Sequence, residues 1–147
     1  MKKRLFNFIV IMIVIVGSII GYINSKNGTI NIVNILIDNV ERGNLKEVGL
    51  SNEQVNSIKE MFKFSSDNEL IRPKVNIREA SKNGNEEELI ATFEIFQYSR
   101  DNKIENIYTG QLLFKLVKKS ISKWEVVEVK TLEKLKNTVK VSQARFV

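Results

Sequence analysis

The 147 residues of this chain include no cysteine and no histidine. The chain therefore cannot form a disulfide, a Ser-His-Asp or Cys-His catalytic arrangement, or a metal site built on imidazole or thiolate. A carboxylate-only cation site needs acidic residues at loop spacing, which the run Glu86–Glu88 lacks, and we interpret that run as the solvated start of a strand. No glycine-rich phosphate loop is present. We expect a non-enzymatic protein without catalytic residues, cofactor or metal.

The longest apolar stretch is Leu5–Ile23, which carries no charge and follows the basic segment Met1–Arg4. As a helix its 19 residues would reach roughly 28 Å, close to the thickness of a bilayer hydrocarbon core. Three cations precede the run and only Lys26 follows it closely, which favours a cytoplasmic N-terminus. Gly17 and Gly21 form a G-x-x-x-G pair at which two such helices could pack, although glycine is also common in spanning helices generally.

A cleaved signal peptide is the alternative interpretation of this segment. Signal peptides have a shorter apolar core and a small-residue cleavage site, whereas here the first alanine is Ala80 and no A-x-A motif follows the run. We therefore expect an uncleaved anchor in the cell membrane, with the bilayer contacted through Leu5–Ile23. Cleavage would make the protein secreted, and in both cases the following domain lies outside the cytoplasm.

The net charge of +6 does not indicate nucleic-acid binding. Lys2, Lys3, Arg4 and Lys26 supply four of these charges, which leaves 19 basic and 17 acidic residues in 27–147. The last third is basic, with nine cations against three anions in residues 115–147, and could face anionic lipid, a cell-wall polymer or an acidic partner, or be a solvated face. Heavy use of Ile, Asn and Lys is typical of an AT-rich bacterial genome.

Two helices are predicted after a short polar linker. The first begins at Thr29 as an N-cap and ends at Gly43 in the C′ position. Its apolar residues recur at helical spacing: Ile30, Val33, Ile37 and Val40. The second begins with the capping box formed by Ser51 and Gln54 and is broken at Ser65–Asn68. Its apolar stripe comprises Val55, Ile58, Met61 and Phe62.

Alternating patterns then predict about four antiparallel strands. The first contains Val75 and Ile77 after Pro73, and Asn83-Gly84 marks a hairpin leading to the second, Leu89–Tyr98. That second strand is apolar on both faces, as expected for a central strand that is covered on both sides or has one face in an interface.

The third strand is Ile107–Val117, in which Gly110 indicates a bulge or bend, and the fourth is Trp124–Leu132. Residues 133–147 could form a short helix, a further strand pairing or a disordered end. The predicted organisation is a basic flank and anchor at 1–26, an α+β domain with two helices on a curved sheet at 27–132, and a basic tail at 133–147.

Two segments carry a resemblance to a known family. The segment Ile35–Val48 (ILIDNVERGNLKEV) and the strand pattern at Lys123-Trp124 with Val126 and Val129 resemble the nuclear transport factor 2-like superfamily of cystatin-like α+β proteins, particularly its membrane-anchored bacterial members. The resemblance covers residues 29–132. It implies a cone in which a curved sheet wraps around helices and leaves a pocket at its wide end.

Two functions follow from these patterns. The preferred one is a single-pass, membrane-anchored, extracytoplasmic interaction domain, a non-catalytic subunit of a bacterial cell-envelope assembly such as conjugation or secretion machinery, with a protein partner or a second copy as its ligand. The alternative is a protein that binds a small apolar ligand or lipid in the cone. Its candidate pocket comprises Phe93, Ile95, Leu112, Phe114 and Trp124, for which ordinary core packing is the competing interpretation.

Overall fold

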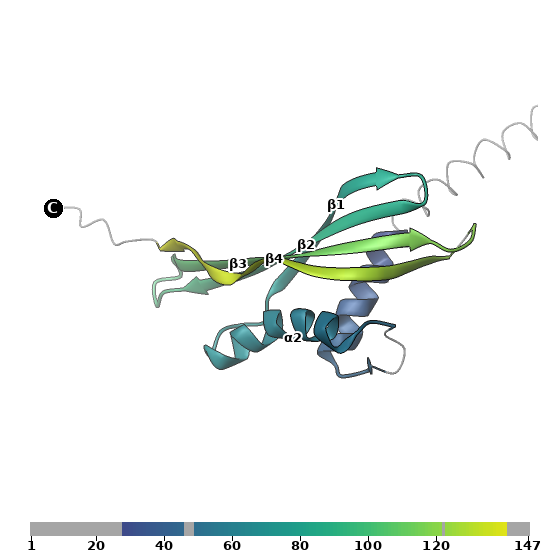
Figure 1. Cartoon of the computed structure of the whole chain (residues 1–147). Helices are drawn as coiled ribbons and strands as arrows, with labels where there is room; N and C mark the ends of the chain where they lie inside the picture. The colour runs from purple at the N-terminus through teal and green to yellow at the C-terminus, as the bar shows by residue number, and fades with distance from the viewer. Residues whose placement is uncertain (1–27, 46–48, 122, 141–147) are drawn as a thin grey trace, which may run out of the picture.

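The computed structural model describes residues 28–45, 49–121 and 123–140, and it has the α+β architecture predicted from the sequence. Residues 28–41 are helical, and the other elements are α2 (Asn52–Asp67), β1 (Lys74–Asn83), β2 (Glu86–Tyr98), β3 (Ile104–Lys118) and β4 (Trp124–Lys140). The strands form one antiparallel sheet in the order β1-β2-β3-β4, and both helices lie on the same side of it (Figure 1). The prediction of two helices on a four-stranded antiparallel sheet is confirmed.

The predicted anchor Leu5–Ile23, with Gly17 and Gly21, lies outside the described residues. Within the ranges that are described, neither helix is long and apolar enough to cross a membrane.

Both predicted helix boundaries at residues 43 and 51 are correct, and each rests on backbone hydrogen bonding. Gly43 has a φ of 78°, its N–H donates to Val40 O, and the N–H of Asn44 donates to Asn39 O. This pair of bonds is the Schellman arrangement that satisfies the last carbonyls of a helix. At the start of α2, the Ser51 hydroxyl accepts from Gln54 N, and the Gln54 side chain accepts from Ser51 N at 2.9 Å. Both capping-box bonds are therefore formed.

The prediction that Thr29 caps the first helix is wrong. Residue 28 is already helical, and the Thr29 hydroxyl is directed into the protein, where its side chain is fully buried. The break predicted at Ser65–Asn68 also comes too early, because α2 continues to Asp67 and Ser65 is buried on its inner face. Asn68 is the C-cap residue.

The core lies between the helices and alternate residues of the two central strands. Cross-strand pairs such as Leu89 with Phe114 and Ala91 with Leu112 have no exposed surface. From α2, the ring of Phe62 meets that of Phe93 edge-on, with 5.6 Å between the centroids. The predicted inward positions of the first helix are correct, since Val33, Ile37 and Val40 are all buried and Ile30 packs partly buried against them.

The hairpin between β1 and β2 turns at Gly84 and Asn85, one residue later than the predicted Asn-Gly pair. Gly84 has a φ of 56°, while Asn83 remains in the strand opposite Glu86. Glycine at the first central position is the choice of turns whose twist matches that of the strands. The hairpin prediction is confirmed, with the turn displaced by one residue.

The fourth strand is longer than predicted and continues from Leu132 to Lys140. Residues 133–140 pair with β3 as far as Lys140 opposite Asn106, so of the three alternatives for this stretch the strand pairing is correct there. Residues 141–147 lie outside the described part of the chain. Leu132, Leu135 and Val139 have a weak helical spacing, and irregularities in the β3–β4 register break the alternation expected of a strand, so the sequence alone leaves both alternatives open.

Gly110 is the position at which β4 crosses closely over β3. A Cβ at this residue would lie 2.9 Å from the backbone N of Leu135 and 3.0 Å from the Met61 sulfur. The β3–β4 register is irregular between Thr109 and Gln111, which confirms the predicted bulge. Glycine thus permits the sheet, the crossing strand and α2 to meet at one point.

Replacing Gly110 by alanine is expected to lower the free energy of unfolding by roughly 1–3 kcal/mol, because the methyl group must displace backbone atoms of β4. Urea unfolding followed by Trp124 fluorescence measures this loss. The matched control is Gly49→Ala, since a Cβ at Gly49 meets nothing within 4 Å. Equal stability of the two variants would contradict the close-approach argument.

Candidate functional site

The five residues predicted to line a pocket lie mainly in the core. Phe93, Ile95, Leu112 and Phe114 have no exposed surface and belong to the main hydrophobic cluster. Only Trp124, near the end of the sheet, is partly exposed and packs against the edge of this cluster. Four of the five thus pack as ordinary core residues, and none lines either of the two hollows described next.

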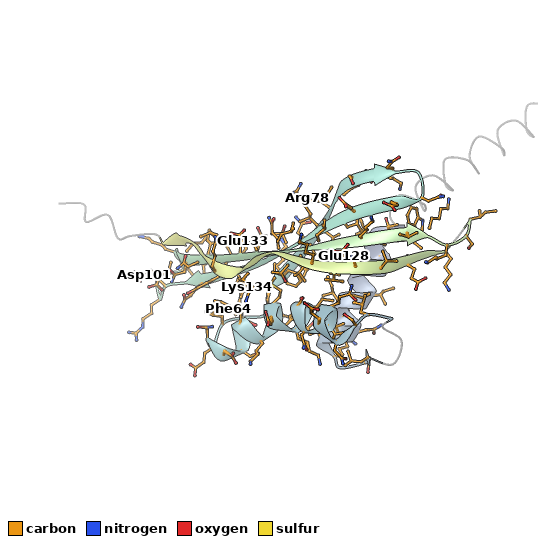
Figure 2. The ribbon with its side chains drawn as sticks, viewed as in Figure 1. Phe64, Arg78, Asp101, Glu128, Glu133 and Lys134 are labelled. Atoms are coloured by element: carbon orange, nitrogen blue, oxygen red, sulfur yellow. The ribbon has the colours of Figure 1, made fainter. Side chains whose placement is uncertain are left out.

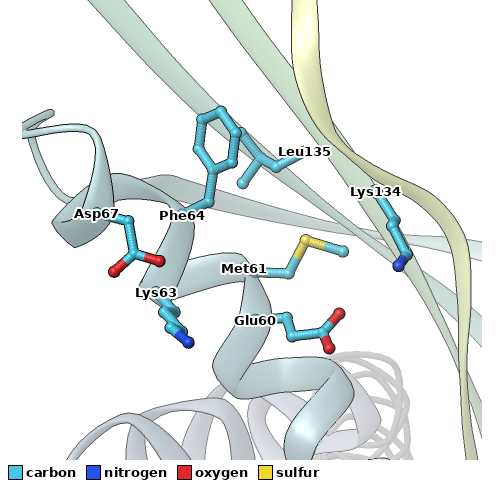
Figure 3. Close-up of a pocket in the computed structure, with 7 residues that line it drawn as sticks. All are labelled: Glu60, Met61, Lys63, Phe64, Asp67, Lys134 and Leu135. Carbon is cyan, nitrogen blue, oxygen red and sulfur yellow. The ribbon is translucent and has the colours of Figure 1, made fainter.

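The first hollow lies between the C-terminal half of α2 and β4 and has a volume of about 240 Å³ (Figure 3). Met61, Phe64 and Leu135 form its apolar floor, and charged side chains surround it, with Glu60 on one side and Lys134 on the other. A second and more polar hollow of about 550 Å³ lies between the start of α2 and β4, beside Gln54 and Lys130. The first hollow is smaller than typical ligand pockets, which measure roughly 300–1,000 Å³.

Glu87 is the most unusual side chain of the described structure, because it is a carboxylate with only 1% of its surface exposed. The Thr29 hydroxyl donates to Glu87 Oε1 at 2.9 Å, and Lys82 Nζ lies 3.0 Å from Oε2. A buried carboxylate is costly unless it is paired and hydrogen-bonded, and here both oxygens have a partner. The interpretation of Glu86–Glu88 as a solvated strand start is therefore wrong for Glu87.

An aromatic ring with two cations completes this cluster. The Lys82 ammonium lies 5.6 Å from the centroid of Trp124, and the Lys118 ammonium lies 6.0 Å from it. Both distances suit a cation–π contact. The cluster thus connects the first helix to all four strands at one end of the sheet, through Thr29, Lys82, Glu87, Lys118 and Trp124.

Strand parity was the sequence signal that could have located Glu87. Successive side chains of a strand point to opposite faces, so odd and even positions of β2 lie on different faces. Glu87 has the same parity as Leu89, Ala91 and Phe93, and so belongs to the face of β2 that the helices cover. Its neighbours Glu86 and Glu88 point the other way, where Glu86 pairs with Lys115 at 3.0 Å and Glu88 accepts from the Ser81 hydroxyl at 3.2 Å. The ion pair with Glu86 raises the pKa of Lys115.

Arg72 forms a second polar contact between segments distant in sequence. Its guanidinium donates to both oxygens of Glu41 and lies 3.3 Å from Asp38, which attaches the first helix to the segment before β1. It also lies over the ring of Phe62, 5.6 Å from the centroid. The hydrogen bonds from Arg72 lower the pKa of Glu41 below its ordinary value of 4.5, and the same pairing raises the pKa of Arg72.

The other face of the sheet has no helix over it among the described elements. Side chains with the opposite parity to the core lie there, and Figure 2 shows Arg78 on this side and Phe64 on the helix side. Two apolar pairs lie on it between charged and polar neighbours: Ile90 opposite Leu113, and Phe96 opposite Ile107. We call these four residues the open-face apolar pairs; all are partly exposed. β2 is central, as predicted, but helices cover only one of its faces.

No group of three or more metal-ligating side chains occurs in the described ranges. Comparisons with family models, with curated proteins and with solved structures give no match to this chain.

Removing the cation beside Glu87 is expected to destabilise the protein more than removing the carboxylate charge. Lys82→Met leaves a buried anion with one partner and should cost about 2 kcal/mol, below the 3–5 kcal/mol of fully buried pairs because 37% of Lys82 is exposed. Glu87→Gln keeps an oxygen for Thr29 and lets Lys82 turn to water, so its cost should be smaller. A double-mutant cycle by urea unfolding measures the coupling, and strictly additive effects would contradict it.

The Arg72–Glu41 contact predicts a pH-dependent contribution to stability. Because the pKa of Glu41 is lowered in the folded protein, the stabilisation is complete above 4.5 and is lost as the pH falls through the folded value. Arg72→Gln should therefore cost about 0.5–1 kcal/mol at pH 7, a modest figure because the pair is partly solvated, and the difference from the unmodified chain should shrink below pH 4. Thermal unfolding of both proteins between pH 7 and pH 2 measures this difference in stability.

The control for this pair is Arg100→Gln, an exposed arginine in the β2–β3 connection. Its effect on stability should be small at every pH. A cost for Arg72→Gln that stays constant to pH 2 would rule out the charge pairing and assign the effect to packing on Phe62.

Proposed function

We propose that this protein is a single-pass, membrane-anchored, extracytoplasmic interaction domain, and that it acts as a non-catalytic subunit of a bacterial cell-envelope assembly such as conjugation or secretion machinery. The apolar run Leu5–Ile23 and its basic flank support the anchor and the orientation. The lack of cysteine and histidine supports a role in binding rather than catalysis.

The observation that carries the interaction role is the open face of the sheet. The open-face apolar pairs leave Ile90, Leu113, Phe96 and Ile107 partly exposed in the two central strands. Apolar surface rimmed by polar residues marks sites of protein association. A protein partner or a second copy of this chain seated there would bury the apolar pairs, and the charged side chains around them would form the rim.

The resemblance to the nuclear transport factor 2-like superfamily remains part of this proposal, supported by the motifs at 35–48 and 123–129 and by the helix-on-sheet architecture. The alternative function, binding of a small apolar ligand, has less support. Four of its five predicted lining residues have no exposed surface, so a ligand would have to separate α2 from the sheet to reach them.

A photoreactive probe on the open face is expected to crosslink the partner in intact cells. The chain has no cysteine, so Arg78→Cys provides a single thiol, exposed and opposite Ile90 in the β1–β2 register. A membrane-impermeant maleimide carrying a photoreactive group should label the full chain from outside the cell. Illumination should then yield a discrete crosslinked product.

The matched control is Lys59→Cys, on the exposed side of α2. It should label equally and should not give that product. Labelling of both positions only after lysis would overturn the orientation. Labelling without a product specific to position 78 would overturn the interaction surface while leaving the orientation intact.

A further inference from the structure

The two hairpins at one end of the sheet bring several lysines together. The backbone N–H of Lys118, at the end of β3, donates to Asn85 O in the β1–β2 turn at 2.8 Å. This bond holds the turn against the loop that connects β3 to β4. Lys82 and Lys118 both lie close to the Trp124 ring, with their ammonium groups 5.6 and 6.0 Å from its centroid.

The loop between β3 and β4 places an apolar side chain among cations. The N–H of Lys119 donates to Lys123 O at 2.9 Å, which closes the loop, and both lysine side chains are exposed. Between them Ile121 is 95% exposed, more than any other large apolar side chain of the described residues. We use the term basic tip for six residues: Lys82, Lys118, Lys119, Ile121, Lys123 and Trp124.

Nearby acidic groups do not neutralise the basic tip. Glu87 is buried and is held by Lys82 and Thr29, and Glu86 is paired with Lys115. Glu125 is exposed on β4 opposite Val117, with the parity of the open face. Glu88 accepts from the Ser81 hydroxyl and has no cation of the described residues paired with it, so the four lysines against Glu87, Glu88 and Glu125 leave a net charge of +1 at this end.

The first described residues of the first helix lie at this end of the sheet, because Thr29 reaches Glu87 one residue after β2 starts. Residues 24–27 are all that separates the apolar run ending at Ile23 from the helical residue 28. This connection spans at most roughly 18 Å even when fully extended. If the run crosses the bilayer, the basic tip lies next to the headgroups.

We propose that the basic tip is a contact surface for anionic phospholipid. This inference rests on the proposed anchor and adds to it a specific lipid chemistry. Lysines are attracted by the negative surface potential of an anionic leaflet. A partly exposed tryptophan and a protruding isoleucine suit the interfacial zone of the bilayer. The four lysines would therefore select lipids by the charge of the headgroup and not by the acyl chains.

The test uses Trp124, the only tryptophan of the chain, as a reporter. The full chain is reconstituted in vesicles of phosphatidylglycerol and phosphatidylcholine, or of phosphatidylcholine alone, each with the same fraction of headgroup-spin-labelled lipid. We expect at least twofold stronger quenching of Trp124 in the anionic vesicles. The difference should disappear in 0.5 M salt, because exposed charges are then screened.

Lys119→Gln with Lys123→Gln should abolish the preference for anionic vesicles. The matched control removes two exposed lysines from α2, Lys59→Gln with Lys63→Gln, and should leave the preference unchanged. Equal quenching in both vesicle types, or equal effects of the two double variants, would overturn the lipid contact.

Alkaline washing of the vesicles separates this inference from the anchor. A chain that resists extraction but shows no lipid preference overturns the basic tip and leaves the anchored function standing. If alkaline washing extracts the chain from the vesicles, the anchor is overturned. In that case the difference in Trp124 quenching between the two vesicle types, measured before the wash, still decides whether the lipid contact exists. A change in Trp124 caused only by an anionic polymer, and not by the vesicles, would also contradict a phospholipid partner.

Discussion

The structure depends on one continuous apolar contact between two helices and the inward side chains of β2 and β3. Phe93 and Phe114 are its largest fully buried members, and Phe62 extends it into α2. Each large side chain removed from water contributes roughly 1.5–3 kcal/mol. Because the chain has no cysteine, no disulfide supplements this contact. The helices, the sheet and the polar clusters at their edges are positioned by it.

Glu87 shows how a polar group is accommodated at the margin of this core. Its carboxylate would be unfavourable among apolar neighbours, but Thr29 and Lys82 approach it from a helix and from a neighbouring strand. Such an arrangement forms only when three segments reach their native positions together. It therefore adds specificity to a core whose apolar contacts alone are non-directional.

Much of the fold could be predicted from the sequence because its signals are local. The capping box at Ser51, the terminating Gly43, the bulge at Gly110 and the parity of β2 depend on residues close in the chain. The full length of β4 could not be predicted, since its register irregularities break the alternation. The contacts of Glu87 with Thr29 and of Arg72 with Glu41 could not be predicted, because these partners are distant in sequence. The basic tip could not be predicted as a unit because Lys82 joins residues 118–124 only through the folded sheet. The alternation of the strands correctly places four of the five predicted pocket residues on the inward face of the sheet. It cannot show whether that face lines a cavity or packs as a solid core, and the structure shows core packing for these four.

The hydrogen bond between Thr29 and Glu87 also determines where a mechanical load would enter the domain. Thr29 is the second described residue of the first helix, and Glu87 lies on a central strand that is hydrogen-bonded on both sides. A pull transmitted along the chain from its N-terminal side would load this hydrogen bond, and through it β2, as well as the apolar contacts of the helix with the core. The load on β2 would be resisted by its pairing with both β1 and β3, because β2 is not an edge strand. The position of a single threonine gives the domain a point of attachment on one of the two central strands of its sheet.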